Sequence, residues 1–150
     1  MRLDGLVALE EQQRLDRPVA GRITFQRRRK VDASVLADIE FARGRPAEAE
    51  RLHRYVLAAR RRILPTKHPL IVVSVSNVAD VLAQSGRLAE AEPLFREALA
   101  VRRHTLDPDH PDVAASVNNL ASALHDLGRL AEAEPLYREA LAMDRRRSGS

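Results

Sequence analysis

The sequence contains no cysteine and no tryptophan, and aromatic residues make up only 3% of its 150 residues. Without cysteine, a disulfide framework and a thiolate nucleophile are excluded. No window of the sequence is apolar over the length that a membrane-spanning helix requires. The N-terminal residues carry acids and bases throughout, unlike a signal peptide. These absences lead us to expect a cytoplasmic protein with no membrane partner.

Net charge of one sign is also scarce over most of the chain. The formal net charge of +4 comes from residues 1–30, which hold eight Arg or Lys and four Asp or Glu, whereas the rest holds 17 of each sign. A nucleic-acid-binding protein more often carries basic charge on a face of its folded body and interleaves aromatic residues for base stacking. We therefore do not expect nucleic-acid binding; the alternatives for it are the basic residues 1–30 and, as a minor interpretation, the arginine clusters at 60–62, 102–103 and 145–147.

Motifs for catalysis, metals and cofactors are missing as well. No glycine-rich phosphate loop is present, and no serine is framed by a nucleophile motif. No two histidines have the helical spacing of a metal site. We predict a protein that is not an enzyme and that uses no metal and no cofactor. The five histidines, two of which precede proline in a repeated linker, are His53, His68, His104, His110 and His125.

The sequence does contain an internal repeat. "GRLAEAEPLFREALA" at 86–100 returns as "GRLAEAEPLYREALA" at 128–142, with fourteen of fifteen residues identical and a spacing of 42. A fixed period between 20 and 50 residues is typical of stacked-repeat proteins. The period divides the chain into an N-terminal leader (1–27), a degenerate first repeat (28–69), a second repeat (70–111), a third repeat (112–147) and a short tail (148–150).

Each repeat is predicted to form two helices. In the third repeat, apolar residues recur at helical spacing along 112–127 and again along 130–147. Gly128 lies between the two segments and is expected to form the turn, because glycine adopts left-handed dihedral angles without strain.

Prolines fall near the starts of the second helices and in the linker between repeats. Pro93 and Pro135 fall near the end of the first turn of the second helices, where proline costs at most about one backbone hydrogen bond. The prolines within 105–112 end one helix, and Asp112 is expected to cap the start of the next.

The repeat resembles the tetratricopeptide repeat, in particular the 42-residue form of kinesin light chains and many bacterial signalling proteins. Small residues allow two helices to approach, and an aromatic residue fills the gap beside them. In the first repeat Glu40 and His53 stand where an apolar residue and an aromatic are expected, and residues 7–18 resemble the end of a further second helix. The positions that carry the resemblance are Val75, Val78, Ala79, Leu82, Ala91 and Phe95, and then Val117, Leu120, Ala121, Leu124, Ala133 and Tyr137.

This resemblance implies an all-α fold, an α-solenoid of stacked antiparallel helix pairs with about three repeats. It also implies a concave groove lined by the first helix of each pair. In such repeats, asparagines that match Asn77 and Asn119 hold the main chain of an extended peptide. The predicted groove residues are Ser76, Asn77, Asp80 and Gln84 from the second repeat and Asn118, Asn119, Ser122, His125 and Asp126 from the third.

Two interpretations of the asparagines stay open. A carboxamide offers both a donor and an acceptor and can pair with any peptide bond, but it can equally join one repeat to the next. Asp38, Asp80 and Asp126 favour a basic or neutral ligand, although charges on a solvated helix face more often have no specific role. The arginine clusters at 60–62, 102–103 and 145–147 are interpreted as complements of the helix dipole.

The predicted function is a protein-protein interaction scaffold that binds a peptide segment of a partner in the groove. The alternative is a structural spacer or a self-associating segment of a larger bacterial signalling protein. Self-association as a homo-oligomer would use an exposed apolar face at the end of the last repeat. A stack of repeats stays soluble as a monomer only when its terminal repeat has a polar outer face.

Overall fold

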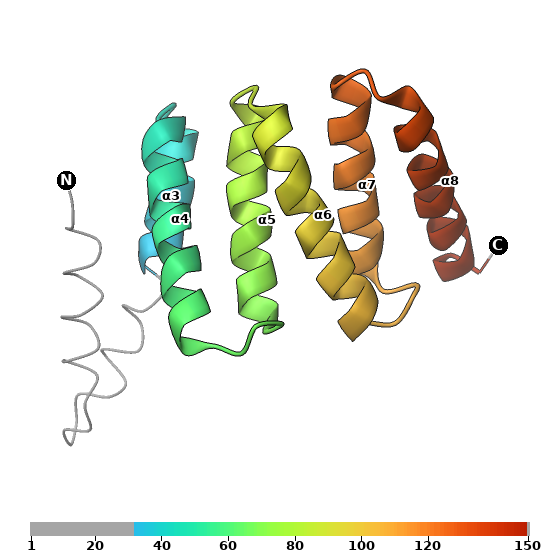
Figure 1. The fold of residues 1–150 in the computed structure, drawn as a ribbon, viewed down its shortest axis with the longest axis horizontal. Helices are drawn as coiled ribbons and strands as arrows, with labels where there is room; N and C mark the ends of the chain where they lie inside the picture. Colours follow the sequence, from blue (N-terminus) through green and yellow to red (C-terminus); the bar gives the residue numbers. More distant parts are fainter. Residues whose placement is uncertain (1–31, 150) are drawn as a thin grey trace. The chain divides into compact units, whose positions relative to one another are not determined.

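A computed structural model of the protein describes residues 32–149. All regular elements in this range are α-helices (Figure 1). The chain divides into two compact units, one up to Arg62 and the other from Ile63 onward. The predicted leader 1–27, including 7–18, lies outside the described residues. The helices are α3 (Asp32–Ala42), α4 (Pro46–Ile63), α5 (Pro69–Gln84), α6 (Leu88–Thr105), α7 (Pro111–Asp126) and α8 (Leu130–Arg147).

The second unit consists of the helix pairs α5–α6 and α7–α8, and α6 packs against α7 to join them (Figure 1). Three alanines of the repeat pattern, Ala79, Ala91 and Ala121, are completely buried. Larger side chains fill the layers between them, and burial of each contributes roughly 1.5–3 kcal/mol. These larger buried residues are Val75, Val78, Leu82, Phe95, Leu99, Val117, Leu120 and Leu124.

Glycine forms the turn within each pair, as the sequence predicted. Gly86 and Gly128 have φ angles of 79° and 80°, in the left-handed region that favours glycine. The amide of the following residue, Arg87, donates to the carbonyl of Leu82 at 2.8 Å, which satisfies a carbonyl at the end of α5. The turn reverses the chain within three residues and places α6 beside α5.

The linkers between pairs correct one prediction. Asp112 does not cap α7: the N-cap is His110, whose Nδ1 accepts a hydrogen bond from the amide of Asp112 at 3.0 Å. Pro111 occupies the first helical position, where it needs no donor, and Asp112 lies in the first turn. His68 caps α5 in the same way through the amide of Leu70. The repeated His-Pro dipeptide is thus a helix start, in which the imidazole replaces the usual short polar cap.

Pro93 and Pro135 lie inside α6 and α8, just beyond the first turn near whose end they were predicted. Each removes one backbone donor, and the carbonyl that loses its partner in α6 belongs to the exposed residue Ala89. Because water reaches that carbonyl, the helix continues through the proline.

In the first unit, polar residues occupy two buried positions of the repeat. Glu40 is 7% exposed, and its carboxylate pairs with the guanidinium of Arg45 at 3.0 Å. His53 is 3% exposed, and its Nε2 lies 3.4 Å from Asp38. Burial lowers the pKa of His53, and the nearby Asp38 carboxylate only partly opposes that effect. The degenerate repeat therefore keeps its fold by giving each buried polar group a partner.

Candidate functional site

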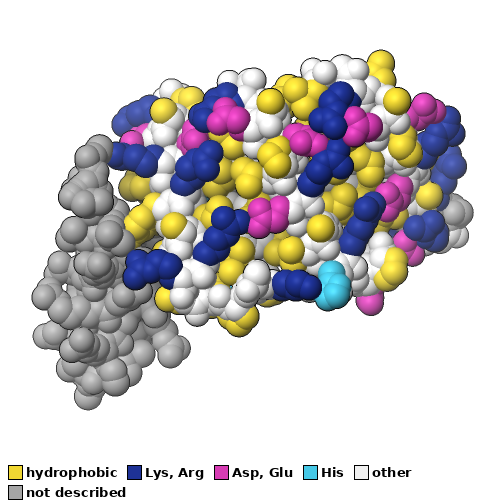
Figure 2. Space-filling view, viewed as in Figure 1, with side chains coloured by type: hydrophobic (Ala, Val, Ile, Leu, Met, Phe, Trp, Pro, Cys, Tyr) yellow, Lys and Arg dark blue, Asp and Glu magenta, His cyan; other side chains and the backbone are white. Residues whose placement is uncertain are grey.

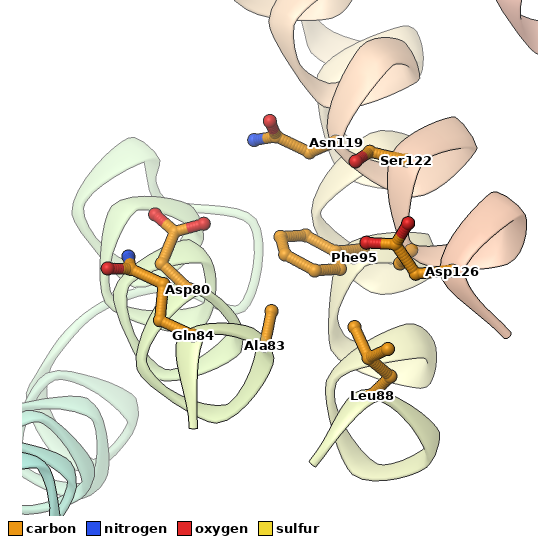
Figure 3. A pocket seen from close by; sticks show the side chains of 9 residues that line it. Asp80, Ala83, Gln84, Leu88, Phe95, Asn119, Ser122 and Asp126 are labelled. Carbon is orange, nitrogen blue, oxygen red and sulfur yellow. The ribbon is translucent and has the colours of Figure 1, made fainter. Parts of the chain in front are cut away.

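A cavity of about 240 Å³ lies between α5 and α7, with α6 beneath it (Figure 3). We call it the Phe95 cavity after the aromatic ring at its base. Nine residues line it: Asp80, Ala83 and Gln84 from α5, Leu88 and Phe95 from α6, and Asn119, Ser122, Ala123 and Asp126 from α7.

Helical spacing explains how the two walls form. Asp80 and Gln84 are four residues apart and so project from one face of α5. Asn119, Ser122 and Asp126 follow at intervals of three and four along α7 and form the facing wall. Figure 3 shows the two sets on opposite sides, with the ring of Phe95 between them. The cavity therefore combines an apolar base with polar walls.

The carboxylate of Asp80 is the most perturbed group of this site. Burial raises its pKa, and the positive charge of Arg102 opposes that shift only in part. No cationic side chain among the described residues forms an ion pair with Asp80 within 4.0 Å. Asp126, on the opposite wall, is exposed and lies 3.2 Å from Nδ1 of the neighbouring His125. Two carboxylates from different helices thus face one cavity. No basic side chain of the described residues lines it.

The structure brings together five of the nine residues that the sequence predicted for the groove. Asp80, Gln84, Asn119, Ser122 and Asp126 line the cavity. The other four lie on the same two helices but outside the lining. Of these, Ser76 and Asn77 are half-buried on α5, Asn118 is exposed on α7, and the ring of His125 meets that of Tyr137 edge to face at 6.5 Å.

The asparagine side chains have no hydrogen-bond partner within the described part of the chain. This holds for Asn77 and Asn119, which are half-buried, and for the exposed Asn118. Their donors and acceptors are therefore available to a ligand, and no described contact uses them to join the repeats.

A joining role belongs instead to Arg102, which the sequence interpretation assigned to the helix dipole. Its guanidinium donates to the hydroxyl of Ser116 at 2.7 Å and so connects the end of α6 with α7. Phe95 was also not predicted as a cavity residue, because it shares a helical stripe with the core. The sequence did hold a signal for the Arg102–Ser116 bond, because both residue types recur one repeat apart. The recurring pairs are Arg60 and Arg102, and Ser74 and Ser116.

Other arginines form exposed ion pairs between helices. Arg96 and Arg103 of α6 pair with Glu132 and Glu139 of α8, at 3.3 and 2.6 Å. Figure 2 shows acidic and basic side chains interspersed over these helices, with no large area of one sign on the visible face. Exposed pairs of this kind contribute at most about 1 kcal/mol each, so they add little to the stability of the fold.

Two searches of the described residues were negative. Residues 32–149 contain no group of three or more His, Asp or Glu side chains that could hold a metal ion. None of the six helices is both long enough and apolar enough to span a membrane.

The sequence matches a family model described as the tetratricopeptide repeat, over residues 33–103 and again over 71–146. A search of curated proteins gives no significant match. Together the two matched segments cover most of the chain, including every helix from α4 to α7.

Solved structures with the same fold include kinesin-light-chain proteins. A Podosopora anserina kinesin light chain with nearly identical TPR-like repeats has a TM-score of 0.71 at 29% identity, covering 77% of this chain and 55% of that one. BtubC (BKLC) of P. vanneervenii has a TM-score of 0.68, also at 29% identity, covering 97% and 56%. Bacillus thuringiensis PlcR, in complex with the peptide PapR7 and DNA, has a TM-score of 0.63 at 16% identity, covering 98% and 54%. The chain therefore spans little more than half the length of these structures.

Proposed function

Because this chain belongs to the tetratricopeptide-repeat family, with the predicted all-α, kinesin-light-chain-like repeat fold, we propose that it binds an extended peptide segment of a partner protein between α5 and α7. Members of the family are typically non-enzymatic interaction scaffolds, and this general role is the premise of the proposal. A cytoplasmic location and the absence of nucleic-acid binding remain predictions from the sequence.

The unused carboxamides carry the proposal. An extended peptide has one donor and one acceptor per residue that need partners once water is removed. Asn77 and Asn119 occupy equivalent repeat positions on α5 and α7, and neither side chain makes a hydrogen bond to another described residue. Each can offer a donor and an acceptor to the same peptide. Asparagine is a poor helix former, so two of them at equivalent positions in helices require a local reason, and main-chain recognition supplies one.

Photo-crosslinking tests the proposal directly. Benzoyl-phenylalanine placed at Ser122, on the wall of the Phe95 cavity, is expected to capture a partner segment, and capture should fall at least tenfold when Asn77 and Asn119 are both changed to alanine. The matched control is Glu134→Ala, an exposed change on α8. Circular dichroism must show equal helicity for all variants. Equal capture by the Asn77→Ala/Asn119→Ala variant would contradict main-chain recognition by these amides.

A second candidate is self-association, favoured by the outer face of α8. Leu141 is 50% exposed, whereas Leu99, its counterpart one repeat earlier, is 4% exposed because α7 covers it. Leu130 and Tyr137 continue the exposed stripe on α8. We propose that another helix covers this stripe, either from a second copy of the chain or from a longer repeat array in which this segment acts as a spacer.

Sedimentation analysis distinguishes self-association from a role as a spacer in a longer repeat array. The average mass should rise with concentration for the wild type and stay at the monomer value for Leu141→Glu. The control Leu70→Glu alters a leucine of similar exposure, 44%, at the start of α5. A wild-type mass that remains monomeric at every concentration would rule out self-association.

A further inference from the structure

The Phe95 cavity has the size of one side chain. Its volume of about 240 Å³ is below the roughly 300–1,000 Å³ of pockets that hold small-molecule ligands. The described residues contain no group of three or more His, Asp or Glu side chains that could hold a metal ion. A single side chain, inserted from a segment that lies along α5 and α7, therefore fits the cavity better than a cofactor or an ion.

The chemistry of the walls indicates what kind of side chain enters. The base is apolar, with Phe95 and Leu88 from α6. The walls carry the carboxylates of Asp80 and Asp126, and Figure 3 shows them on opposite sides of the Phe95 ring. An acidic residue would be repelled, and an apolar residue would cover carboxylates without compensating them, which is unfavourable.

The burial of the Asp80 carboxylate, and its lack of an ion pair, strengthen the case for a cationic side chain in the cavity. Its carboxylate is half-buried and forms no ion pair within 4.0 Å in the described part of the chain. Arg102, the cation that acts on it, already donates to Ser116. A carboxylate that is partly removed from water and left without a direct cationic partner is stabilised most by a charge-assisted hydrogen bond.

We propose that the Phe95 cavity is a specificity pocket for an arginine side chain of the bound partner segment. The proposal rests on the function proposed above. The guanidinium binds between Asp80 and Asp126, and the aliphatic part of the side chain packs on Phe95. Arginine fits better than lysine because its planar group presents five N–H donors and no acceptor, and the walls offer carboxylate, amide and hydroxyl oxygens from two directions. An aromatic ring beneath the pocket adds a favourable contact with the cation.

The test is a selection of random dodecapeptides displayed on phage, performed on the wild-type chain and on an Asp80→Asn/Asp126→Asn variant. Asparagine keeps the shape of aspartate, and circular dichroism with thermal unfolding verifies that the variant is folded. Wild type is expected to enrich peptides with arginine at one fixed position. In a selected synthetic peptide, replacement of that arginine by the neutral isostere citrulline should weaken binding roughly tenfold or more. The double variant should bind both peptides within about twofold of each other.

The outcomes separate this proposal from the one on which it rests. If wild type enriches no peptide, or enriches peptides that bind the Asn77→Ala/Asn119→Ala variant equally well, the proposed peptide-binding function fails, and the arginine pocket fails with it. If peptides are selected and depend on the asparagines, but arginine is not enriched or citrulline binds equally, only the arginine pocket is overturned. A consistent preference for lysine over arginine would also overturn the assignment of a guanidinium.

Discussion

The guanidinium of Arg102 donates a hydrogen bond of 2.7 Å to the hydroxyl of Ser116, which is 2% exposed. The two residues belong to consecutive repeats, and this bond joins the second helix of one to the first helix of the next. Buried polar groups destabilise a fold unless they are paired, so the arginine and the serine depend on each other. Arg102 also acts on Asp80: burial raises the pKa of that carboxyl group, and the positive charge of Arg102 opposes the rise in part.

Removal of the serine hydroxyl should therefore destabilise the repeat interface. Ser116→Ala is expected to lower the free energy of unfolding by about 1.5–3 kcal/mol, the usual range for a hydrogen bond to a charged group. Urea denaturation measures the change. The control is Ser122→Ala on the same helix, an exposed position where the effect should stay within about 0.5 kcal/mol. Equal stability of the two variants would contradict a stabilising role for the Arg102–Ser116 bond.

His53 should make the stability of the protein depend on pH. Burial lowers its pKa in the folded state below that of the unfolded chain, so the unfolded chain binds the proton more readily. The stability that neutral His53 contributes is fully present above the unfolded pKa of about 6.5. It is lost as the pH falls through the lowered pKa of the folded state. The neighbouring Asp38 reduces this loss but does not cancel it.

The change His53→Phe restores the aromatic residue that the other repeats carry, and it should abolish that acid-sensitive part of the stability. Urea unfolding between pH 7.5 and 5 makes the comparison. His104, an exposed histidine at the end of α6, provides the control: His104→Phe should leave the wild-type pH dependence in place. If His53→Phe and wild type lose stability in parallel over this range, burial of His53 is not the cause.

Asp80 is expected to make stability depend on pH in the opposite direction to His53. Burial raises its pKa in the folded state, so at neutral pH the ionised carboxylate opposes folding. Asp80→Asn should therefore be more stable than wild type at pH 7, by up to about 1 kcal/mol. The advantage should shrink as the pH falls through the raised pKa, because wild type then takes up the proton. Thermal unfolding at pH 7 and pH 4 measures this difference.

The exposed Asp126 on the facing wall serves as the control for that measurement, since Asp126→Asn removes the same charge without the burial. A gain in stability for Asp126→Asn as large as that for Asp80→Asn would mean that general charge reduction, rather than burial of Asp80, explains the effect.

The sequence predicted those features that depend on local periodicity. Spacing of apolar residues gave the helices, and the glycine at 86 and 128 gave the turns, because each follows from the dihedral preferences of a few neighbouring residues. The cap at 110 was missed, since an aspartate two residues later matched the usual cap chemistry and the imidazole did not. The Arg102–Ser116 bond was missed because it depends on how α6 crosses α7. Asn119 lines the Phe95 cavity and Asn118 does not, because adjacent residues of a helix project in different directions.

The turn at Gly86 allows a test of pure backbone strain. An added Cβ would meet no atom within 4 Å, so Gly86→Ala creates no clash, and its whole cost comes from holding a side chain at a φ of 79°. That conformation costs roughly 1–2 kcal/mol for a residue other than glycine, and less for asparagine. Urea denaturation should therefore rank the variants as wild type, Gly86→Asn and Gly86→Ala in order of decreasing stability.

The matched control is Gly149, which lies just beyond the end of α8 with a φ of 74° and equally open surroundings. Gly149→Ala should change the stability by less than about 0.5 kcal/mol, because the end of the last helix can unwind locally without disturbing a helix pair. If Gly86→Ala proves as harmless as Gly149→Ala, the left-handed turn is not what holds α6 against α5.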